Sequence, residues 1–333
     1  MNVALIGLGR WGPRLIPKLL DHRVVDGIYC FDIDRTRMDK VVQEFPTLKV
    51  TSDYESILSN QKIDALIIAT PAASHYSLAR RALEHGKHVL VEKPLSNKVA
   101  QAQHLIELAS AQDLRLMVDH ITVYSGMVRA IKKLIDSKDM GRLLYIDSVR
   151  AGLGMLQLDV SVVWDLAVHE FAVVDYLLDE KPSAVSATGS AFYGALEEIA
   201  YATLFFQSGL AAHVHVSWLS PVRIRKLMIS GMKKMLVFDD TLSDDKITLF
   251  DRGVDDSRSA GVDEPAFAYR DGVCQVLPYD RTEPMVALID EFMRSIDEGR
   301  APLTNGTEGL RIVKILEAVE ESIKKQGMRV KLA

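Results

Sequence analysis

The chain contains 333 residues, 48% of them hydrophobic and 7% aromatic, and this size favours two medium-sized domains over one large core. Its formal net charge of -5 at pH 7 argues against general electrostatic binding to nucleic acid or to an anionic membrane, because both require a concentrated basic surface. No run approaches the roughly 20 consecutive apolar residues of a membrane helix, and the amino-terminal residues do not resemble a secretory leader. The two cysteines, Cys30 and Cys274, lie far apart and have no Cys or His at metal-ligand spacing. We therefore expect a cytoplasmic protein with free thiols, no metal site, and neither nucleic-acid nor membrane partners.

The first feature along the chain is a glycine turn after a short apolar run. Gly7, Gly9 and Gly12 follow the run 3–6, a helical pattern comes next, and Asp32 ends the following apolar run. The first glycine permits a tight turn, the second lets the backbone approach a pyrophosphate, and the third lets the helix pack against the strand. Amides at the helix N-terminus would face the phosphates, and Asp32 stands where a carboxylate accepts hydrogen bonds from both ribose hydroxyls. The spacing predicts a dinucleotide site, the alternative being a glycine turn that binds no ligand.

Asp32 also bears on which dinucleotide binds. A carboxylate at that place repels a 2′-phosphate, which favours NAD over NADP. Arg35 and Arg37 lie just beyond it and could compensate in an NADP enzyme, or could be solvated charges at the start of a helix. We expect NAD.

The first third of the chain alternates apolar runs with helical patterns such as 77–84 and 99–111. This rhythm predicts a parallel sheet with right-handed crossovers, a doubly wound Rossmann domain over residues 1–119. The runs that we expect to form its buried strands are 3–6, 27–31, 65–69, 88–91 and 114–118.

Ligands of such a sheet bind at the carboxyl ends of its strands. Lys93 is the most informative residue there, because a lysine at this strand end points toward the expected nicotinamide position and Pro94 fixes an extended exit from the strand. A surface lysine is the alternative. The residues at the strand ends are Gly7, Asp32, Thr70, Pro71, Glu92, Lys93 and His120.

From residue 143 onward the pattern changes to longer strands with direct connections, which predicts a mostly antiparallel sheet in an α+β domain over residues 120–333. Because both faces of 199–206 carry apolar residues, we expect one face to bury against a partner subunit. We expect 251–279 to be a long irregular surface segment and 308–325 to be a final helix. The predicted strands are 143–151, 183–189, 199–206, 210–218 and 226–230.

Asp165 and His169 are a second candidate for chemistry. They lie four residues apart on a predicted helix that ends near 179–182, so they share one face, where the carboxylate could orient and charge-stabilise the imidazole. An exposed helical pair without a catalytic role is the alternative.

Four motifs occur in one order along the chain: Gly7-Leu8-Gly9-Arg10-Trp11-Gly12, Ala69-Thr70-Pro71 with His75, the segment 86–96 that contains Glu92-Lys93-Pro94, and Asp165 with His169. Together they closely resemble the Gfo/Idh/MocA family of sugar and inositol oxidoreductases, over essentially the whole chain. The resemblance implies tightly held NAD(P) and a C-terminal domain whose open sheet is used in oligomerisation, hence a homodimer or homotetramer. It also implies that Lys93 touches the nicotinamide end and the reacting hydroxyl, with His169 as general acid or base and Asp165 as its partner. The implied cofactor residues are Gly7, Gly9, Arg10, Trp11, Gly12, Asp32, Thr70, Pro71, His75, Glu92 and Lys93.

Within the family, the segments 147–150, 153–154, 159–160, 163–167 and 217–221 look like a branch found with nucleotide-sugar and surface-polysaccharide pathways. This resemblance implies oxidation of the C3 hydroxyl of UDP-N-acetylglucosamine or a close relative to a 3-keto sugar. Two residues depart from the branch: Val168 stands where proline is usual, and Glu170 where aspartate is usual.

Several side chains could contact such a substrate. Arg150 could bind its diphosphate, because a guanidinium matches phosphate oxygens in pairs, and Tyr124 could stack on its base or sugar. A strand salt bridge and a core-edge aromatic are the respective alternatives. The expected substrate contacts are Lys93, Tyr124, Arg150, Trp164 and His169.

Oxidation of a secondary alcohol requires loss of the hydroxyl proton as the hydride leaves, so Lys93 and His169 both qualify as the base. Two other functions stay open: a dehydrogenase or keto-reductase for a free sugar, inositol or other polyol, and a non-catalytic cofactor-binding sensor. The presence of Lys93, Asp165 and His169 together argues against the sensor.

Overall fold

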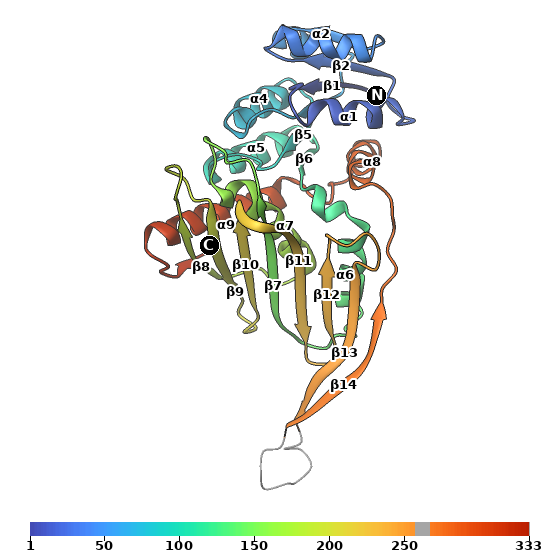
Figure 1. Cartoon of the computed structure of the whole chain (residues 1–333). Coiled ribbons are helices and arrows are strands. Elements are labelled where there is room, and N and C mark those ends of the chain that lie inside the picture. Colours follow the sequence, from blue (N-terminus) through green and yellow to red (C-terminus); the bar gives the residue numbers. More distant parts are fainter. Residues whose placement is uncertain (257–266, 333) are drawn as a thin grey trace. The chain divides into compact units, whose positions relative to one another are not determined.

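The structure, a computed structural model, describes residues 1–256 and 267–332 and divides into two compact units (Figure 1). The first unit comprises Met1–Tyr124 and Thr282–Lys314, and the second Ser125–Arg281 and Ile315–Ala333. The chain therefore leaves the first unit, builds most of the second, returns once to the first and ends in the second. Within the described residues, no helix is both long enough and apolar enough to cross a membrane.

The first unit is built on a six-stranded parallel sheet in the order β3-β2-β1-β4-β5-β6, which confirms the predicted Rossmann fold. The central strands are covered on both sides, and Val3, Ile6, Ala65 and Ile68 are all 0% exposed. This is why these strands read as continuous apolar runs. The strands are β1 (Asn2–Ile6), β2 (Gly27–Phe31), β3 (Lys49–Thr51), β4 (Ala65–Ile68), β5 (His88–Glu92) and β6 (Leu116–Asp119).

Helices connect these strands, and the order of the sheet reverses between β1 and β4. That reversal creates the crevice in which ligands of doubly wound sheets bind. The helices of the first part of this unit are α1 (Gly12–Leu20), α2 (Arg35–Glu44), α3 (Tyr54–Ser59), α4 (Ala72–Glu84), α5 (Val99–Ala111) and the 3₁₀ turn η1 (Ile121–Tyr124).

The returning segment completes the free edge of this sheet. Helix α8 (Pro284–Asp297) packs against α1 and η1, and Thr304 then pairs with β6: its carbonyl accepts from the Val118 amide at 2.8 Å and its hydroxyl donates to the Val118 carbonyl at 2.7 Å. Helix α9 (Gly306–Lys324) begins directly afterwards and confirms the predicted final helix. A Cβ on Gly309 would lie 2.7 Å from Val118 Cγ2, so glycine lets α9 lie close to β6.

The second unit contains a nine-stranded mixed sheet in the order β14-β13-β12-β11-β7-β10-β9-β8-β15. Every neighbouring pair is antiparallel except β7 with β10, which confirms the predicted mostly antiparallel sheet. The strands are β7 (Leu143–Leu153), β8 (Ala184–Ser190), β9 (Ile199–Phe205), β10 (Ala211–Ser217), β11 (Leu219–Gly231), β12 (Met235–Asp239), β13 (Ile247–Asp256), β14 (Phe267–Val276) and β15 (Val330–Lys331).

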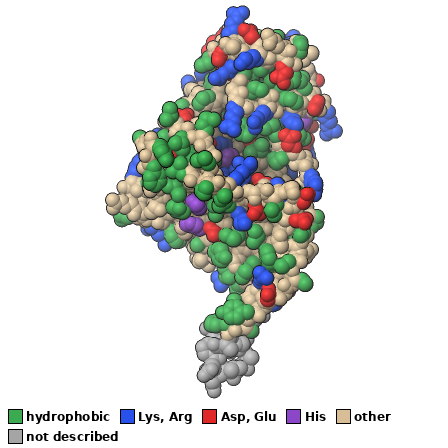
Figure 2. All heavy atoms as spheres, viewed as in Figure 1, with side chains coloured by type: hydrophobic (Ala, Val, Ile, Leu, Met, Phe, Trp, Pro, Cys, Tyr) green, Lys and Arg blue, Asp and Glu red, His purple; other side chains and the backbone are tan. Residues whose placement is uncertain are grey.

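One face of this sheet is covered by helices: α6 (Gly126–Asp136), the π-helical turn η2 (Val163–Ala167), α7 (Val168–Leu177) and the last turns of α9 (Figure 1). On β9 and β10 the residues of the covered face are buried, as Ala202 and Val214 show. The residues that alternate with them are more open, and Tyr201 is 41% exposed. The sheet therefore has one packed face and one open face, and hydrophobic and histidine side chains are visible on the surface of this unit (Figure 2).

The prediction that 251–279 forms an irregular surface segment is wrong for most of its described residues. Strand β13 runs on to Asp256 and pairs with β14, while residues 257–266 lie outside the described part of the chain. Nearly every residue of β14 is exposed, so the strand has no buried face. Without a buried face it needs no alternation of apolar and polar residues, and its sequence consequently looks like a loop.

Candidate functional site

The glycine turn lies between β1 and α1 of the first unit. Gly7 has φ +99°, and a Cβ there would lie 2.6 Å from the Ala69 carbonyl oxygen; a Cβ on Gly12 would lie 2.0 Å from the Gly7 carbonyl oxygen. Gly9 differs, because among the described residues a Cβ there would touch only Arg37, at 3.7 Å. The turn is thus tight where the chain must fold back and open where a pyrophosphate would approach. It fits a dinucleotide, and α1 begins there without a side-chain cap.

Arg10 and Trp11 complete the turn. Both are exposed, and Trp11 is the residue that precedes α1. The Arg14 guanidinium lies 4.9 Å from the centroid of the Trp11 ring, a cation–π contact that holds the indole against the first turn of α1.

Asp32 follows β2 and is 4% exposed. Its two carboxylate oxygens accept from the backbone amides of Leu8, at 2.7 Å, and Asp34, at 2.8 Å, so the side chain ties the end of β2 to the glycine turn. Arg37 Nη1 lies 3.5 Å from the same carboxylate. Each carboxylate oxygen has two lone pairs, which leaves acceptor capacity for ribose hydroxyls.

His75 of α4 joins two segments of the crevice. It is 1% exposed, its Nε2 lies 2.8 Å from the Thr70 carbonyl, and its Nδ1 lies 2.8 Å from the Pro94 carbonyl. Burial lowers the pKa of His75, although the hydrogen bonds to the two carbonyls act in the opposite direction and raise it. The imidazole therefore fixes Thr70 and Pro71, the residue that precedes α4, against the segment that follows Lys93.

Lys93 follows β5 directly and is half-buried, and the peptide bond between Lys93 and Pro94 is cis. Its neighbour Glu92 stands opposite Asp119 of β6, and the two carboxyl groups are hydrogen-bonded to each other. Burial, followed by the charge of Asp119, raises the pKa of Glu92 well above its ordinary value. Burial likewise raises the pKa of Asp119 to about 6. The pair therefore holds a proton next to Lys93 at a pH where separate carboxyl groups would have lost it.

Tyr124 occupies the interior of the first unit. Its side chain is 1% exposed, and its hydroxyl lies 2.9 Å from Thr304 Oγ1. This placement matches the aromatic core residue considered as the alternative for Tyr124, and contact of its ring with a substrate stays a prediction.

Asp165 and His169 lie in the second unit at the junction of η2 and α7, and both are half-buried. The helix is confirmed over 168–177, but 163–167 is a π-helical turn, a form that occurs frequently at functional sites. The Asp165 carboxylate accepts from Trp218 Nε1 at 3.2 Å. Trp164 is 8% exposed and donates from Nε1 to Glu320 of α9 at 2.6 Å.

Arg150 lies on β7 and donates from Nε to Glu170 of α7. Glu170 is 7% exposed and also accepts from the Ser148 hydroxyl, so it links α7 to β7. The strand salt bridge considered for Arg150 is therefore present, and its contact with a substrate stays a prediction.

The predicted residues thus form two groups. In the first unit, the glycine turn and Asp32 share one hydrogen-bonded cluster, while Thr70, His75 and Pro94 share another. In the second unit, one short helical segment carries Trp164, Asp165, His169 and Glu170. Two further residues contact these groups and were not among the predicted site residues: Asp119, which pairs with Glu92, and Trp218, which donates to Asp165. Asp119 had a detectable signal, because it ends the strand that follows β5, as Glu92 ends β5.

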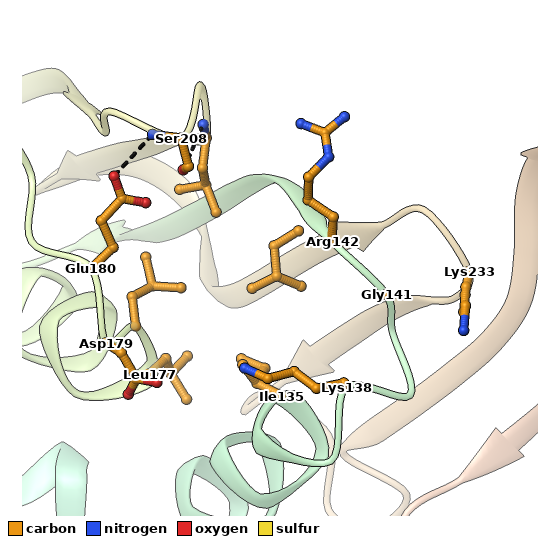
Figure 3. Close-up of a pocket in the computed structure, with 12 residues that line it drawn as sticks. Ile135, Lys138, Gly141, Arg142, Leu177, Asp179, Glu180, Ser208 and Lys233 are labelled. Atoms are coloured by element: carbon orange, nitrogen blue, oxygen red, sulfur yellow. Dashed lines mark hydrogen bonds between the residues drawn. The ribbon is translucent and has the colours of Figure 1, made fainter.

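A separate pocket of about 470 Å³ lies in the second unit (Figure 3). Ile135, Leu177 and other apolar side chains enclose it, and Glu180 at its border accepts from the Ser208 amide at 2.9 Å. Figure 3 shows that the side chains of Arg142 and Lys233 extend away from the apolar side chains that line the pocket. None of the predicted site residues lines this pocket.

Two family models match the chain. A model described as the oxidoreductase family with an NAD-binding Rossmann fold matches residues 1–120, and a model of the GFO/IDH/MocA C-terminal domain matches residues 128–237. The two matched ranges contain all the candidate residues except Tyr124.

Curated relatives agree with this match. A 1-carboxy-3-chloro-3,4-dihydroxycyclohexa-1,5-diene dehydrogenase of Comamonas testosteroni is 30% identical over 65% of this chain and 58% of its own length. A scyllo-inositol 2-dehydrogenase (NADP(+)) of Bacillus subtilis is 25% identical over 98% of this chain and 94% of its own.

A UDP-N-acetylglucosamine 3-dehydrogenase of Acidithiobacillus ferrooxidans is similar in both sequence and fold. Its sequence is 23% identical over 94% of each chain. Its solved structure superposes with a TM-score of 0.82 over 98% of each chain, at 21% identity, which is evidence of a shared fold. With both family models matched in order on one chain and a glycine turn shaped for a dinucleotide, the protein belongs to the Gfo/Idh/MocA family and is an NAD(P)-binding oxidoreductase.

Proposed function

We propose that this oxidoreductase removes a hydride from a secondary hydroxyl group of a sugar or polyol. The observation that carries the proposal is the presence of three groups suited to this reaction: Lys93 at the end of β5, and Asp165 with His169 at the η2–α7 junction. The dehydrogenases named above act on hydroxylated rings and support the same substrate class. A cofactor-binding sensor would need none of these three side chains.

The reaction needs a base and a group that stabilises negative charge. When bound, the nicotinamide supplies the hydride acceptor. His169 takes the hydroxyl proton, because an imidazole titrates near neutral pH, and Asp165 stabilises the imidazolium that forms. Lys93 donates a hydrogen bond to the developing alkoxide. Lys93 is the alternative base, and Trp218 holds Asp165 in either case.

We propose NAD as the cofactor. Asp32 presents a buried carboxylate, which would repel a 2′-phosphate, and Arg37 already lies 3.5 Å from Asp32 and 3.4 Å from Asp34. The NADP(+) enzyme of Bacillus subtilis makes NADP the alternative to test. The proposed cofactor residues are Gly7, Gly9, Arg10, Trp11, Gly12, Asp32, Thr70, Pro71, His75, Glu92 and Lys93.

We propose a nucleotide sugar as the substrate, oxidised at C3 as in UDP-N-acetylglucosamine. The relative from Acidithiobacillus ferrooxidans, whose name states this activity, supports the proposal over 94% of the chain. A free inositol is the rival substrate, since the Bacillus subtilis relative carries that activity in its name and matches 98% of the chain.

The experiment combines a thermal-shift measurement with absorbance at 340 nm. The purified protein is mixed with NAD or NADP, alone and with UDP-N-acetylglucosamine, N-acetylglucosamine or scyllo-inositol. The proposal predicts stabilisation by NAD and new 340 nm absorbance with the nucleotide sugar. Turnover of scyllo-inositol alone would establish the rival, and cofactor binding without turnover of any sugar or polyol would favour the sensor.

We also propose that the open face of the sheet forms the contact between subunits of a homodimer or homotetramer. Tyr145 is 48% exposed and Tyr201 41% exposed, and the Tyr201 ring stacks on His215 with centroids 4.5 Å apart. Aromatic side chains of this kind are enriched in interfaces. Light scattering after size-exclusion chromatography tests the proposal: Tyr201→Glu should yield monomers, and an unchanged mass would refute this face as the contact.

A further inference from the structure

Three arginines lie together on the helix-covered face of the sheet in the second unit. Arg150 of β7 stands directly opposite Arg225 of β11 in the antiparallel pairing, so their side chains share one face. Arg223 lies on the same face, because a Cβ added to Gly152, two residues from Arg150, would be 3.9 Å from Arg223 Cβ. Gly152 thus leaves room for the Arg223 stem beside β7. We call these three residues the arginine cluster.

The carboxylates near the arginine cluster do not neutralise it. Glu170 already accepts hydrogen bonds from Arg150 and from the Ser148 hydroxyl. Asp240 lies 3.9 Å from Arg225 but 2.9 Å from Lys246, which it binds more closely. Within the described part of the chain, Arg223 has no ion-pair partner.

Four cations, the three arginines and Lys246, therefore share two carboxylates. Burial, together with the like charges of Arg150 and Arg223, lowers the pKa of Arg225, as expected where positive charge is in excess. A bound anion would remove this repulsion.

The arginine cluster lies next to the proposed reaction centre of the same unit. Glu170, which holds Arg150, follows His169 directly in α7. On the other side, Arg150 pairs with Val216 of β10, two residues before the Trp218 that donates to Asp165. The same short helical segment therefore carries both Glu170, which binds Arg150 of the arginine cluster, and Asp165, the carboxylate proposed to orient the base.

We infer that the arginine cluster is a phosphate subsite that binds the phosphate or diphosphate group of an activated sugar; this inference rests on the proposed sugar oxidation. Guanidinium groups bind phosphate oxygens through paired, charge-assisted hydrogen bonds, and three of them suit a diphosphate. Glu170 holds Arg150 in place, while Arg223 and Arg225 supply the unneutralised charge. A free polyol has no group that would use this subsite.

The first test measures binding without turnover. The full-length wild-type protein, Arg223→Ala, Arg225→Lys and the control Arg142→Ala are titrated with UDP and with inorganic pyrophosphate by calorimetry. Arg225→Lys keeps the charge but loses the paired donors, and Arg142 is an exposed arginine of the same unit outside the arginine cluster. We expect binding to weaken by about tenfold or more in both cluster variants, because each loses at least one charge-assisted hydrogen bond to phosphate. Binding by Arg142→Ala should be unchanged.

The second test separates this inference from the proposed reaction. KM for UDP-N-acetylglucosamine should rise in the two cluster variants, whereas KM for an unphosphorylated sugar or polyol should not change. Equal binding of UDP and pyrophosphate by all four proteins, or a uniform rise of KM for every substrate, would overturn the inference. Failure to oxidise any sugar, with the binding difference intact, would refute the proposed reaction and leave the phosphate subsite supported. If the wild-type protein oxidises a polyol but binds neither UDP nor pyrophosphate, the proposed reaction is supported and the phosphate subsite is refuted.

Discussion

The carboxyl pair of Glu92, which is half-buried, and Asp119, which is buried, allows a prediction about stability that does not depend on the substrate. Both carboxyl groups are ionised in the unfolded chain at pH 8, whereas the folded protein must keep a proton on the pair or bury two adjacent negative charges. Asp119→Asn removes this conflict, because the amide has nearly the size of the carboxyl group and can donate an N–H to Glu92. We therefore expect Asp119→Asn to raise the free energy of unfolding at pH 8.

The magnitude follows from the pKa of Asp119, which rises from 3.8 in the unfolded chain to about 6 in the folded protein. At about 1.36 kcal/mol for each pKa unit, ionisation of this group destabilises the fold by roughly 3 kcal/mol above pH 6. When folding raises the pKa of an acid, the fold has its full stability below the unfolded pKa, where the acid is protonated in both states. The free energy of unfolding then falls as the pH rises from the unfolded pKa through the folded pKa. The advantage of Asp119→Asn should thus be near zero below about pH 4 and should grow until about pH 6.

Chemical denaturation at several pH values between 4 and 8 measures this difference directly. Asp39→Asn is the matched control, since Asp39 is an exposed carboxylate of the same unit. Its free energy of unfolding should parallel that of the wild type at every pH. If Asp119→Asn is less stable than the wild type at pH 8, or if its advantage does not change between pH 4 and pH 8, the two carboxyl groups do not share a proton.

Four other substitutions test the site. Lys93→Met should reduce kcat by at least about 100-fold and change NAD affinity, measured by fluorescence titration, by less than about threefold; a large loss of affinity alone would contradict charge stabilisation. Gly9→Ala should fold normally and bind NAD weakly, whereas Gly12→Ala should lower the melting temperature, because its Cβ would lie 2.0 Å from a carbonyl oxygen; equal melting temperatures would refute this distinction. Trp218→Phe should lower kcat about tenfold with little change in KM by removing the hydrogen bond to Asp165, and a change confined to KM would argue against a positioning role.

The first unit could be predicted from the sequence because its constraints are local. Each strand of the parallel sheet is covered on both sides and must therefore be continuously apolar, as in β1 and β4. Gly7 and Gly12 are required by backbone atoms that lie 2.6 Å and 2.0 Å from the places their Cβ atoms would occupy. Because these contacts leave no room for a Cβ atom, the two glycines mark the turn in the sequence.

Other features depend on partners that are distant in the sequence. The segment 282–314 returns to the first unit through hydrogen bonds between Thr304 and Val118, and neither residue indicates this pairing by its type. The π-helical turn at 163–167 contains the same apolar residues as an ordinary helix would. Strand β14 packs no face against the core and so lacks the alternation by which strands are recognised.

Two buried carboxylates, Asp119 of the first unit and Glu170 of the second, differ in how their charge is compensated, and this difference cannot be seen in the sequence. Asp119 faces Glu92 across the sheet and shares a proton with it, whereas Glu170 faces Arg150 and serves as an ion-pair partner. Strand register sets Glu92 opposite Asp119, and in the second unit it sets Arg150, the partner of Glu170, opposite Arg225. The same register brings together more guanidinium groups than the nearby carboxylates neutralise. The question of which sugar is oxidised thus becomes a question of charge, since a phosphorylated substrate would complete the arginine cluster and a neutral polyol would leave its repulsion in place.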